Sequence, residues 1–463
     1  MFLEIDNKDK NKVAIKDSDN RQITYGEIIE FADLFGKTVG ERTLLFVLNR
    51  NSVGAAAGYL GAMINRIVPL MLSASMDWEL LEELIRIYHP KYLWKPAEMV
   101  AEGEPILLEQ YGYALVGTGL TPYPMYEELS LLLTTSGSTG SPKLVRHSYT
   151  NLEAQARNIS TFFELDDTER PMLDLPINYT MGLSVLNSHL YSEATVLLTS
   201  LNVLSPSYWE YFKREEATSF TNVPYSYEIL KKLRFFRMDL PSLRLITQGG
   251  GKLNEELQRE FAEYAEQTGR RFILTYGQTE GSARMAYLPA EYATTKYGCI
   301  GRAIPNGRLY LIDEEGNEIT EPDVIGEMVY EGPNVTLGYA QTGEDLALED
   351  ERNGVLLTGD MAKKDTDGFF YIVGRKKRFL KLCGYRVGLD ECENLIKAEF
   401  DTECACVGDD SCMRIYVTTE QDHDKMKRYI AEKTNLNSGV FQICLIKKMP
   451  RNEAGKTLYD KLK

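Results

Sequence analysis

The sequence predicts an α/β protein: a large N-terminal domain of layered α/β sheets with a β-rich subdomain, and a small, mobile α+β C-terminal domain. Three observations predict it. Apolar runs alternate with amphipathic helical segments, short strands with Gly, Pro and Asn turns occupy 299–373, and a shorter mixed pattern follows Gly374. With 463 residues the chain can bury two or three cores. We therefore expect domains at 1–374, including the subdomain 299–373, and at 375–463.

Strands and helices alternate in the large domain. Apolar runs predict strands at Thr43–Leu48, Leu131–Thr134, Ala194–Leu198, Leu243–Thr247 and Phe272–Leu274. Helical spacing predicts helices over Leu152–Phe163 and Leu253–Gln267. This alternation favours layered sheets covered by helices.

The last ninety or so residues form a separate α+β pattern. Asp390 and Glu393 offer a capping box for a helix that ends at Phe400. A strand in MRIYVTT, a helix around Asp424–Lys433 and a strand in FQICLIKKM follow. Such a unit has a modest core, which fits a small domain hinged on a large one.

Composition excludes several classes of protein. The chain is 43% hydrophobic and 26% charged, which is typical of a soluble globular protein. No apolar run is long enough to span a bilayer, and the first residues do not resemble a signal peptide, so we expect a cytoplasmic enzyme. The formal charge of −16 argues against nucleic acid as a partner.

Seven cysteines, an odd number, make a disulfide framework improbable in such a chain. Six of them lie beyond residue 380, at Cys383, Cys392, Cys404, Cys406, Cys412 and Cys444. Their spacing gives no paired Cys-x-x-Cys units, so we expect small buried thiols rather than a metal site.

The segment LLLTTSGSTGSPKLVRHSY carries the most specific motif. Its loop holds two glycines, several hydroxyls and a lysine: Thr135, Ser136, Gly137, Ser138, Thr139, Gly140 and Lys143. Close backbone approach, hydroxyl donors and a cation are the chemistry of a polyphosphate clamp. The residues after Lys143 alternate like a strand, so the loop is expected at a hairpin tip, and the spacing is not that of a Walker loop. An ordinary Ser/Gly-rich surface turn is the alternative.

A second motif, TYGQTE, follows an apolar strand. Tyr276 supplies a flat face for a base, Thr279 a hydroxyl for phosphate, and Glu280 a carboxylate suited to Mg²⁺. The alternative is a strand-end turn with a solvated glutamate.

The string TSGSTGSPK, followed in order by YGQTE, LLTGD, a Gly-Arg pair and PRNEAGK, resembles the adenylate-forming (AMP-binding) superfamily. This group includes acyl-CoA synthetases, peptide-synthetase adenylation domains and luciferases, and the resemblance is closest to the acyl-CoA synthetase branch. It implies catalytic roles for Lys456, Thr279 and Glu280, with Glu280 binding Mg²⁺. It also implies that ATP is bound by Thr135, Ser136, Gly137, Ser138, Thr139, Gly140, Lys143, Gly250, Gly251, Tyr276, Gly277, Asp360 and Arg375. Lys377 falls at the family's hinge. The alternative for Asp360 is an ordinary β-turn aspartate without a binding role. The alternative for Arg375 and Lys377 is that both are solvated residues of a basic turn.

The stretch LPINYTMGLSVLNSHL bears on the substrate. Relatives that activate amino acids carry an aspartate where this chain has Gly182, so the resemblance implies a carboxylic acid without an α-amine. The expected pocket residues are Tyr179, Met181, Gly182, Tyr225, Gln248, Gly249 and Arg284. Arg284 either pairs with a second acidic group of the substrate or acceptor, or forms an internal salt bridge.

The implied reaction is ATP-dependent activation of a small carboxylic acid as an acyl-adenylate, with release of pyrophosphate and transfer to a thiol. The resemblance implies CoA or a phosphopantetheine thiol as the acceptor. The small domain is shorter than is usual in the family, so CoA, the pantetheine arm of a carrier protein and another nucleophile all stay open as acceptors. The alternatives are an adenylation protein that loads a discrete carrier protein and a non-catalytic nucleotide-binding homologue. A P-loop NTPase or kinase would instead release phosphate or ADP.

Overall fold

The computed structural model describes residues 1–134, 143–376, 378–382, 385–409, 411–420, 422–434, 436–452 and 457–462. The chain divides into two compact units: unit 1 comprises Met1–Arg308 and Glu331–Leu356, and unit 2 comprises Leu309–Tyr330 and Leu357–Lys463. The predicted α/β class is confirmed, since both units combine sheets with helices. The expected boundary near Gly374 stays a prediction, because unit 2 joins most of the β-rich segment to the last ninety residues.

Unit 1 contains a nine-stranded sheet with a parallel centre. Its strands are, in order across the sheet, β16 (Arg302–Ala303), β15 (Ala286–Leu288), β14 (Arg271–Tyr276), β13 (Leu245–Gln248), β12 (Ser219–Asn222), β10 (Pro171–Leu173), β11 (Val196–Leu198), β1 (Val13–Asp17) and β2 (Gln22–Thr24). Pairing is parallel from β14 to β1 and antiparallel at both sides. The strands predicted from the three apolar runs after residue 190 are confirmed as β11, β13 and β14.

An eight-stranded sheet forms the second layer of unit 1. Its strands are β20 (Gly338–Ala340), β9 (Leu144–Ser148), β8 (Leu129–Thr134), β4 (Val68–Ser73), β3 (Leu44–Asn49), β5 (Tyr92–Pro96), β7 (Tyr113–Gly117) and β6 (Ile106–Gln110). β8 and β9 are antiparallel, with Thr134 opposite Leu144, so the two arms of the expected hairpin are confirmed. The predicted phosphate loop at its tip, 135–142, lies outside the described residues.

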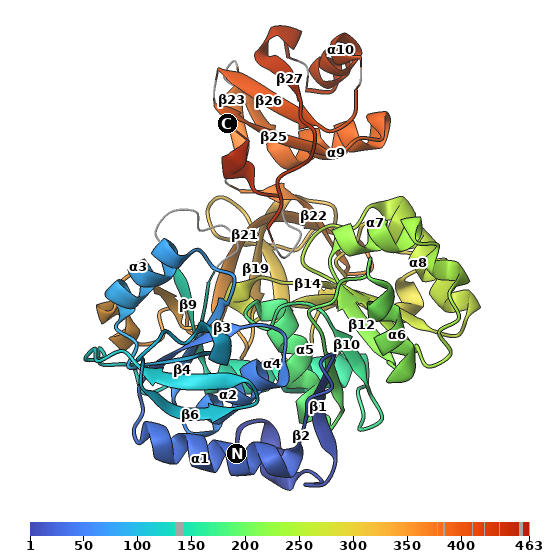
Figure 1. Cartoon of the computed structure of the whole chain (residues 1–463). Helices are drawn as coiled ribbons and strands as arrows, with labels where there is room; N and C mark the ends of the chain where they lie inside the picture. Colours follow the sequence, from blue (N-terminus) through green and yellow to red (C-terminus); the bar gives the residue numbers. More distant parts are fainter. Residues whose placement is uncertain are drawn as a thin grey trace. The chain divides into compact units, whose positions relative to one another are not determined.

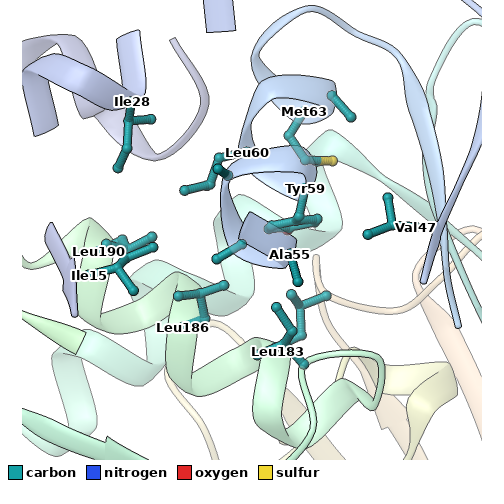
Figure 2. Packing of buried hydrophobic residues seen from close by; sticks show 14 of the residues in the cluster. Ile15, Ile28, Val47, Ala55, Tyr59, Leu60, Met63, Leu183, Leu186 and Leu190 are labelled. Atoms are coloured by element: carbon teal, nitrogen blue, oxygen red, sulfur yellow. The ribbon is translucent and has the colours of Figure 1, made fainter. Parts of the chain in front are cut away.

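Two of the eight helices described in unit 1 pack in the core between the two sheets (Figure 2). The helices of unit 1 are α1 (Tyr25–Val39), α2 (Val53–Ile64), α3 (Trp78–Tyr88), α4 (Tyr149–Phe163), α5 (Thr180–Tyr191), α6 (Pro206–Arg214), α7 (Pro224–Lys232) and α8 (Glu255–Gln267). Figure 2 shows α2 and α5 side chains packed in one core with Val47 of one sheet and Ile15 of the other. α2 is apolar on every face because it is buried on every face. No helix within the described residues is both long and apolar enough to cross a membrane.

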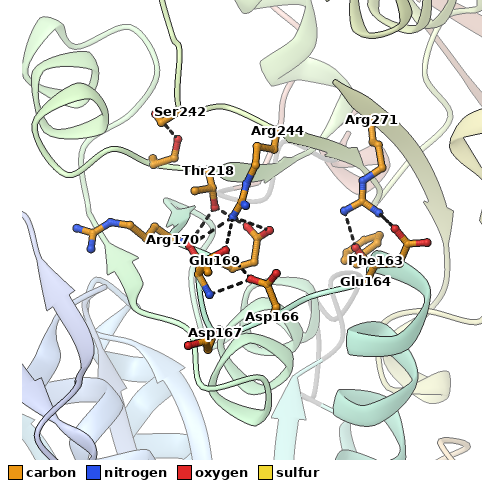
Figure 3. Close-up of polar contacts among 12 residues, drawn as sticks. Phe163, Glu164, Asp166, Asp167, Glu169, Arg170, Thr218, Ser242, Arg244 and Arg271 are labelled. Atoms are coloured by element: carbon orange, nitrogen blue, oxygen red, sulfur yellow. Dashed lines mark hydrogen bonds and ion pairs between the residues drawn. The ribbon is translucent and has the colours of Figure 1, made fainter. Parts of the chain in front are cut away.

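A polar cluster joins the end of α4 and the loop after it to the amino ends of the parallel strands β13 and β14 (Figure 3). Arg244, just before β13, forms an ion pair with Glu169 at 3.0 Å. Arg271, the first residue of β14, forms an ion pair with Glu164 at 2.6 Å and donates to the carbonyl of Phe163 at 2.8 Å. These ion pairs lie at the amino ends of β13 and β14 and leave the carboxyl ends of the two strands available for a binding site.

Unit 2 contains most of a five-stranded sheet and a compact C-terminal cluster. The sheet order is β18 (Glu318–Ile319), β17 (Arg308–Ile312), β19 (Gly326–Glu331), β21 (Val355–Lys364) and β22 (Phe370–Arg375). A ribbon of β23 (Phe379–Leu382) and β24 (Tyr385–Gly388) follows. The C-terminal cluster, orange to red in Figure 1, contains α9 (Leu389–Phe400), β25 (Cys404–Asp409), β26 (Cys412–Val417), α10 (His423–Thr434) and β27 (Phe441–Leu445). Both predicted helices and both predicted strands in this region are confirmed.

The predicted capping box of α9 is wrong. The N-cap is Gly388 and no side chain caps the helix. Asp390 and Glu393 instead form ion pairs with Arg378, the second at 2.7 Å. A guanidinium binds a carboxylate more strongly than a backbone N–H does, so tertiary structure overrides the local motif.

The cysteines of unit 2 agree with the expectation of structural thiols. Cys392, Cys404 and Cys406 are buried, and Cys412 and Cys444 are partly buried. Burial raises the pKa of the Cys392 thiol to about 12, so it is inert at neutral pH. The described parts of the chain hold no group of three or more potential metal ligands. Cys383 lies outside them.

Candidate active site

The parallel strands β10, β12, β13 and β14 are consecutive neighbours, so their carboxyl ends form one edge of the sheet, here called the carboxyl edge. Ligands of open α/β sheets bind at such edges. Two predicted residues, Gln248 and Tyr276, are the last residues of β13 and β14. The predicted residues that come after the ends of the four strands are Tyr179, Met181, Gly182, Tyr225, Gly249, Gly250, Gly251, Gly277, Thr279 and Glu280. The structure thus brings the predicted base-binding and pocket residues to a common edge.

The glycine turn after β13 is shaped by an amide. Gln248 is buried, and its Nε2 donates to the carbonyls of Gly249 and Gly251 at 3.0 and 2.9 Å. Thr275 on the neighbouring strand donates to the Gln248 carbonyl at 3.0 Å. A Cβ at Gly249 would lie 2.9 Å from the sulfur of Met181, so the turn also touches the start of α5. The Gln248 amide therefore fixes the conformation of the turn, and the backbone of Gly249–Gly251 forms the surface of the turn.

Gly182 has no room for a side chain. A Cβ at this position would lie 2.3 Å from the carbonyl oxygen of Pro176 and 2.7 Å from that of Leu175. An aspartate at 182 would require the backbone of the preceding loop to move.

Arg284 is buried without a counter-ion. Its side chain follows β14, Nη1 donates to Ser184 Oγ at 2.6 Å, and the guanidinium lies 5.1 Å from the ring centroid of Phe163. Nε and Nη2 have no hydrogen-bond partner, and the described residues offer it no ion pair. Burial lowers the pKa of Arg284 to about 9. The internal salt bridge considered from the sequence is therefore not found in the part of the chain that the structure describes.

Glu280 and Lys143 both contact Tyr339, a residue that the sequence analysis did not identify. Tyr339 Oη donates to Glu280 Oε1 at 2.7 Å. The Lys143 ammonium lies 3.1 Å from the centroid of the Tyr339 ring. Tyr339 carries no charge and lies in a turn-rich segment, so only the antiparallel pairing of β20 with β9 reveals its position.

The neighbourhood of Glu280 fits a magnesium ion that arrives with a nucleotide. Mg²⁺ in such sites is held by one or two carboxylates together with phosphate oxygens and water, rather than by a cage of protein ligands. Glu280 supplies one carboxylate, Thr279 stands beside it, and no larger carboxylate cluster exists among the described residues. This donor set suits a shared protein–phosphate site.

The predicted ribose-binding residues form a pair within unit 2. Asp360 of β21 lies opposite Arg375 of β22 in the antiparallel ladder, and Arg375 Nε approaches Asp360 Oδ1 to 2.7 Å. Asp360 is buried while Arg375 is half-exposed. The ion pair fixes the orientation of the Asp360 carboxylate, and the Arg375 guanidinium beside it is partly accessible to solvent.

Several predicted site residues fall outside the described ranges: Thr135, Ser136, Gly137, Ser138, Thr139, Gly140, Lys377 and Lys456. Their roles stay predictions. Just before the predicted hinge, the Lys376 ammonium lies 2.6 Å from the carboxylate of Glu327.

Comparison with known proteins identifies the family of this chain. A family model described as AMP-binding enzyme matches residues 3–340. An indoleacetate–CoA ligase of Aromatoleum aromaticum is 30% identical over 280 residues, 60% of this chain and 54% of the relative. A 2-succinylbenzoate–CoA ligase of Bacillus mycoides is 29% identical over 350 residues, 73% of this chain and 70% of the relative. The match thus spans about half the length of the first relative.

Solved structures show the same fold. The O-succinylbenzoate Coenzyme A synthetase (MenE) of Bacillus subtilis in complex with AMP has a TM-score of 0.79 and 20% identity, covering 98% of this chain and 95% of that one. ATP-bound MatB of Rhodopseudomonas palustris has a TM-score of 0.78 and 21% identity, covering 100% of this chain and 97% of that one. The predicted fold class is confirmed by these matches.

Proposed function

The chain belongs to the AMP-binding enzyme family, and from that premise we propose that it is an acid–thiol ligase that activates a carboxylic acid with ATP. The observation that carries the proposal is the assembly of Tyr276, Thr279 and Glu280 with the glycine turn 249–251 at one carboxyl edge. Those groups suit a base, phosphates and a divalent cation.

In the first half-reaction, a carboxylate oxygen of the acid attacks the α-phosphorus of ATP, and the bond from that phosphorus to the pyrophosphate breaks. The product is an acyl-adenylate. Tyr276 stacks on the base, Thr279 binds phosphate, and Asp360 with Arg375 binds the ribose. Lys143 and the loop 135–140 bind the outer phosphates, and Lys456 bridges the carboxylate and the α-phosphate. When Mg²⁺ is bound by Glu280, it neutralises phosphate charge.

In the second half-reaction, a thiolate attacks the acyl carbon and AMP leaves with the electron pair of the broken C–O bond. The site's main contribution is to hold reactants and neutralise charge, since AMP is already a good leaving group. We propose CoA as the acceptor, as the relatives' names indicate for those proteins. A hinge at Lys377 would let the small domain serve both half-reactions, and a cytoplasmic location belongs to the same proposal.

The acid is one without an α-amine. An ammonium group needs a buried counter-charge near the pocket, and Gly182 has no space for the carboxylate that would supply it. Tyr179, Met181, Tyr225 and the turn at Gly249 line the acyl side of this proposed pocket. The acids named for the two relatives, indoleacetate and 2-succinylbenzoate, also lack an α-amine.

Acid-dependent exchange between ATP and pyrophosphate tests the proposal. A panel of carboxylic acids and amino acids is assayed with the wild-type protein and with Lys456→Ala. We expect exchange with some of the acids that lack an α-amine, and a loss of about 10²–10³-fold in the variant. Exchange only with amino acids would refute the substrate class, and release of ADP would refute adenylation.

The acceptor is identified in a second assay. The active acid is supplied with CoA or with a phosphopantetheinylated carrier protein, and thioester formation is followed by mass spectrometry. Thioester with CoA supports the ligase. Thioester with the carrier protein alone would favour an adenylation protein that loads a discrete carrier.

A further inference from the structure

Tyr339 connects groups from three separate segments of unit 1. Its hydroxyl donates to Glu280 at 2.7 Å, and its ring contacts the Lys143 ammonium at 3.1 Å. The guanidinium of Arg352 lies 4.6 Å from the same ring centroid. One uncharged side chain thus touches the proposed magnesium ligand, the proposed phosphate-binding lysine and a further cation.

The backbone of Tyr339 is fixed from two sides. Its carbonyl accepts a hydrogen bond from Nε of the buried Arg146 at 2.9 Å, within the β20–β9 pairing. Three residues earlier, the N–H and hydroxyl of Thr336 both donate to the carbonyl of Glu280, at 3.0 and 2.9 Å. The segment 336–339 is therefore tied to Glu280 at the backbone as well as at the side chain.

The hydroxyl and the ring of Tyr339 make different contacts: the hydroxyl binds the Glu280 carboxylate, and the ring binds the Lys143 ammonium. A carboxylate that accepts a hydrogen bond on one oxygen is held in a fixed direction, and its other oxygen stays available to a cation. An ammonium on a ring face is held by the ring quadrupole without being neutralised, so it can still bind a phosphate. An ordinary phenol has a pKa of about 10, so the Tyr339 hydroxyl is a donor at neutral pH.

We propose that Tyr339 is a positioning residue for the magnesium–triphosphate part of the site. Its phenol O–H orients the Glu280 carboxylate for the metal, and its ring orders Lys143 for the phosphates. This assignment rests on the proposed function. The simpler reading is a packing tyrosine at a sheet margin, which predicts a change in stability but none in metal dependence.

The experiment compares ATP binding to the full-length protein with and without magnesium, by isothermal titration calorimetry. Tyr339→Phe removes the hydroxyl and keeps the ring, whereas Tyr339→Leu removes both. Tyr287→Phe is the matched control, since it deletes the hydroxyl of a tyrosine whose ring stacks on Phe162 of α4. Thermal unfolding of each variant verifies that it is folded.

We expect Tyr339→Phe to need about tenfold more Mg²⁺ for half-maximal enhancement of ATP binding, because loss of a partner that orients a metal ligand typically costs 10–100-fold. Its ATP affinity in EDTA should stay within about twofold of wild type, whereas Tyr339→Leu should lose about threefold or more there. Tyr287→Phe should match wild type throughout.

A folded Tyr339→Phe protein with the magnesium dependence of wild type would overturn the assignment. Wild-type protein that binds ATP with no response to magnesium would overturn the proposed function, and the assignment with it. Magnesium-dependent binding in wild type without exchange on any acid would refute only the ligase reaction, since the binding data on Tyr339 would stand.

Discussion

Two arginines of unit 1 are equally buried and differently satisfied. Arg146 of β9 is 0% exposed and Arg284, after β14, is 1% exposed. Arg146 forms an ion pair with Glu351 at 2.6 Å and donates to the carbonyls of Tyr339, Leu348 and Glu349. Arg284 has one hydroxyl partner, Ser184, and an aromatic ring.

The difference distinguishes a buried charge that stabilises the fold from a buried charge that is available to bind a ligand. A buried guanidinium with full hydrogen bonding ties its neighbours together, and around Arg146 these neighbours include the backbone of Tyr339. A buried guanidinium such as that of Arg284, whose Nε and Nη2 find no hydrogen-bond partner among the described residues, is costly to the fold. Such a cost persists in proteins mostly at functional sites, which favours the pocket role that the sequence predicts for Arg284.

The largest expected effect is that of Arg146→Met. It leaves three backbone carbonyls and the Glu351 carboxylate without their donor, so we expect the free energy of unfolding to fall by about 3–5 kcal/mol. Denaturation in guanidinium chloride measures it. The same substitution at Arg284 is the matched control, and equal losses at both positions would contradict the comparison.

A substitution beside the first arginine should have the next largest effect. Gly338 has φ +139°, and a Cβ there would lie 2.2 Å from Glu351 Oε2 and 2.9 Å from Arg146 Nη2. We expect Gly338→Ala to cost about 2–3 kcal/mol in unfolding free energy, from backbone strain and a displaced ion pair. Gly40→Ala, at φ +80° with no atom within 4 Å, should cost only about 1 kcal/mol. Equal costs at both glycines would show that strain alone accounts for the loss.

Each arginine region also contains a buried neutral histidine, and here the two regions should behave alike. Burial, with Arg352 nearby, lowers the pKa of His147 to about 3. Burial, partly offset by a hydrogen bond with the Val185 carbonyl, lowers that of His189 to about 4. The unfolded chain binds a proton near pH 6.5 and the folded protein does not, so stability falls as pH drops below about 6.5.

Replacing either histidine should remove part of that pH dependence. Between pH 7.5 and 5.5, His147→Gln or His189→Gln should each reduce the loss of unfolding free energy by about 1.4 kcal/mol. Denaturation curves at the two pH values test it. An unchanged slope in either variant would mean that the histidine concerned is protonated in the folded protein.

The smallest expected effect on stability is that of Arg284→Met. It removes a buried charge that has no counter-ion, and Ser184 keeps its hydrogen bond to the Met181 carbonyl, so unfolding free energy should change by less than about 1 kcal/mol or rise. If Arg284 serves the acid pocket, the set of acids that support pyrophosphate exchange should change at the same time. A folded variant with the acid profile of wild type would rule out that role.

Local pattern predicted the regular elements well where one physical cause dominates. The apolar run at Leu243–Thr247 became β13 and the periodic face of Leu152–Phe163 became α4, because burial of apolar side chains sets both. The predicted capping box at Asp390 failed because Arg378, which lies between β22 and β23, is a stronger partner for the carboxylates of Asp390 and Glu393 than a backbone N–H. Local hydrogen-bonding motifs are decided by whatever charge the fold places beside them.

The sequence by itself determined the alternation of strands and helices, the order of the nucleotide-binding motifs and the residue types at the proposed site, since these depend on local periodicity and spacing. Only the tertiary structure decided that Tyr339 joins Glu280 to Lys143 and that Gly182 has no space for a side chain. It also decided that Arg284, unlike Arg146, keeps two guanidinium nitrogens without a hydrogen-bond partner among the described residues. Those facts follow from contacts between segments far apart in the chain, whose partners no local pattern specifies.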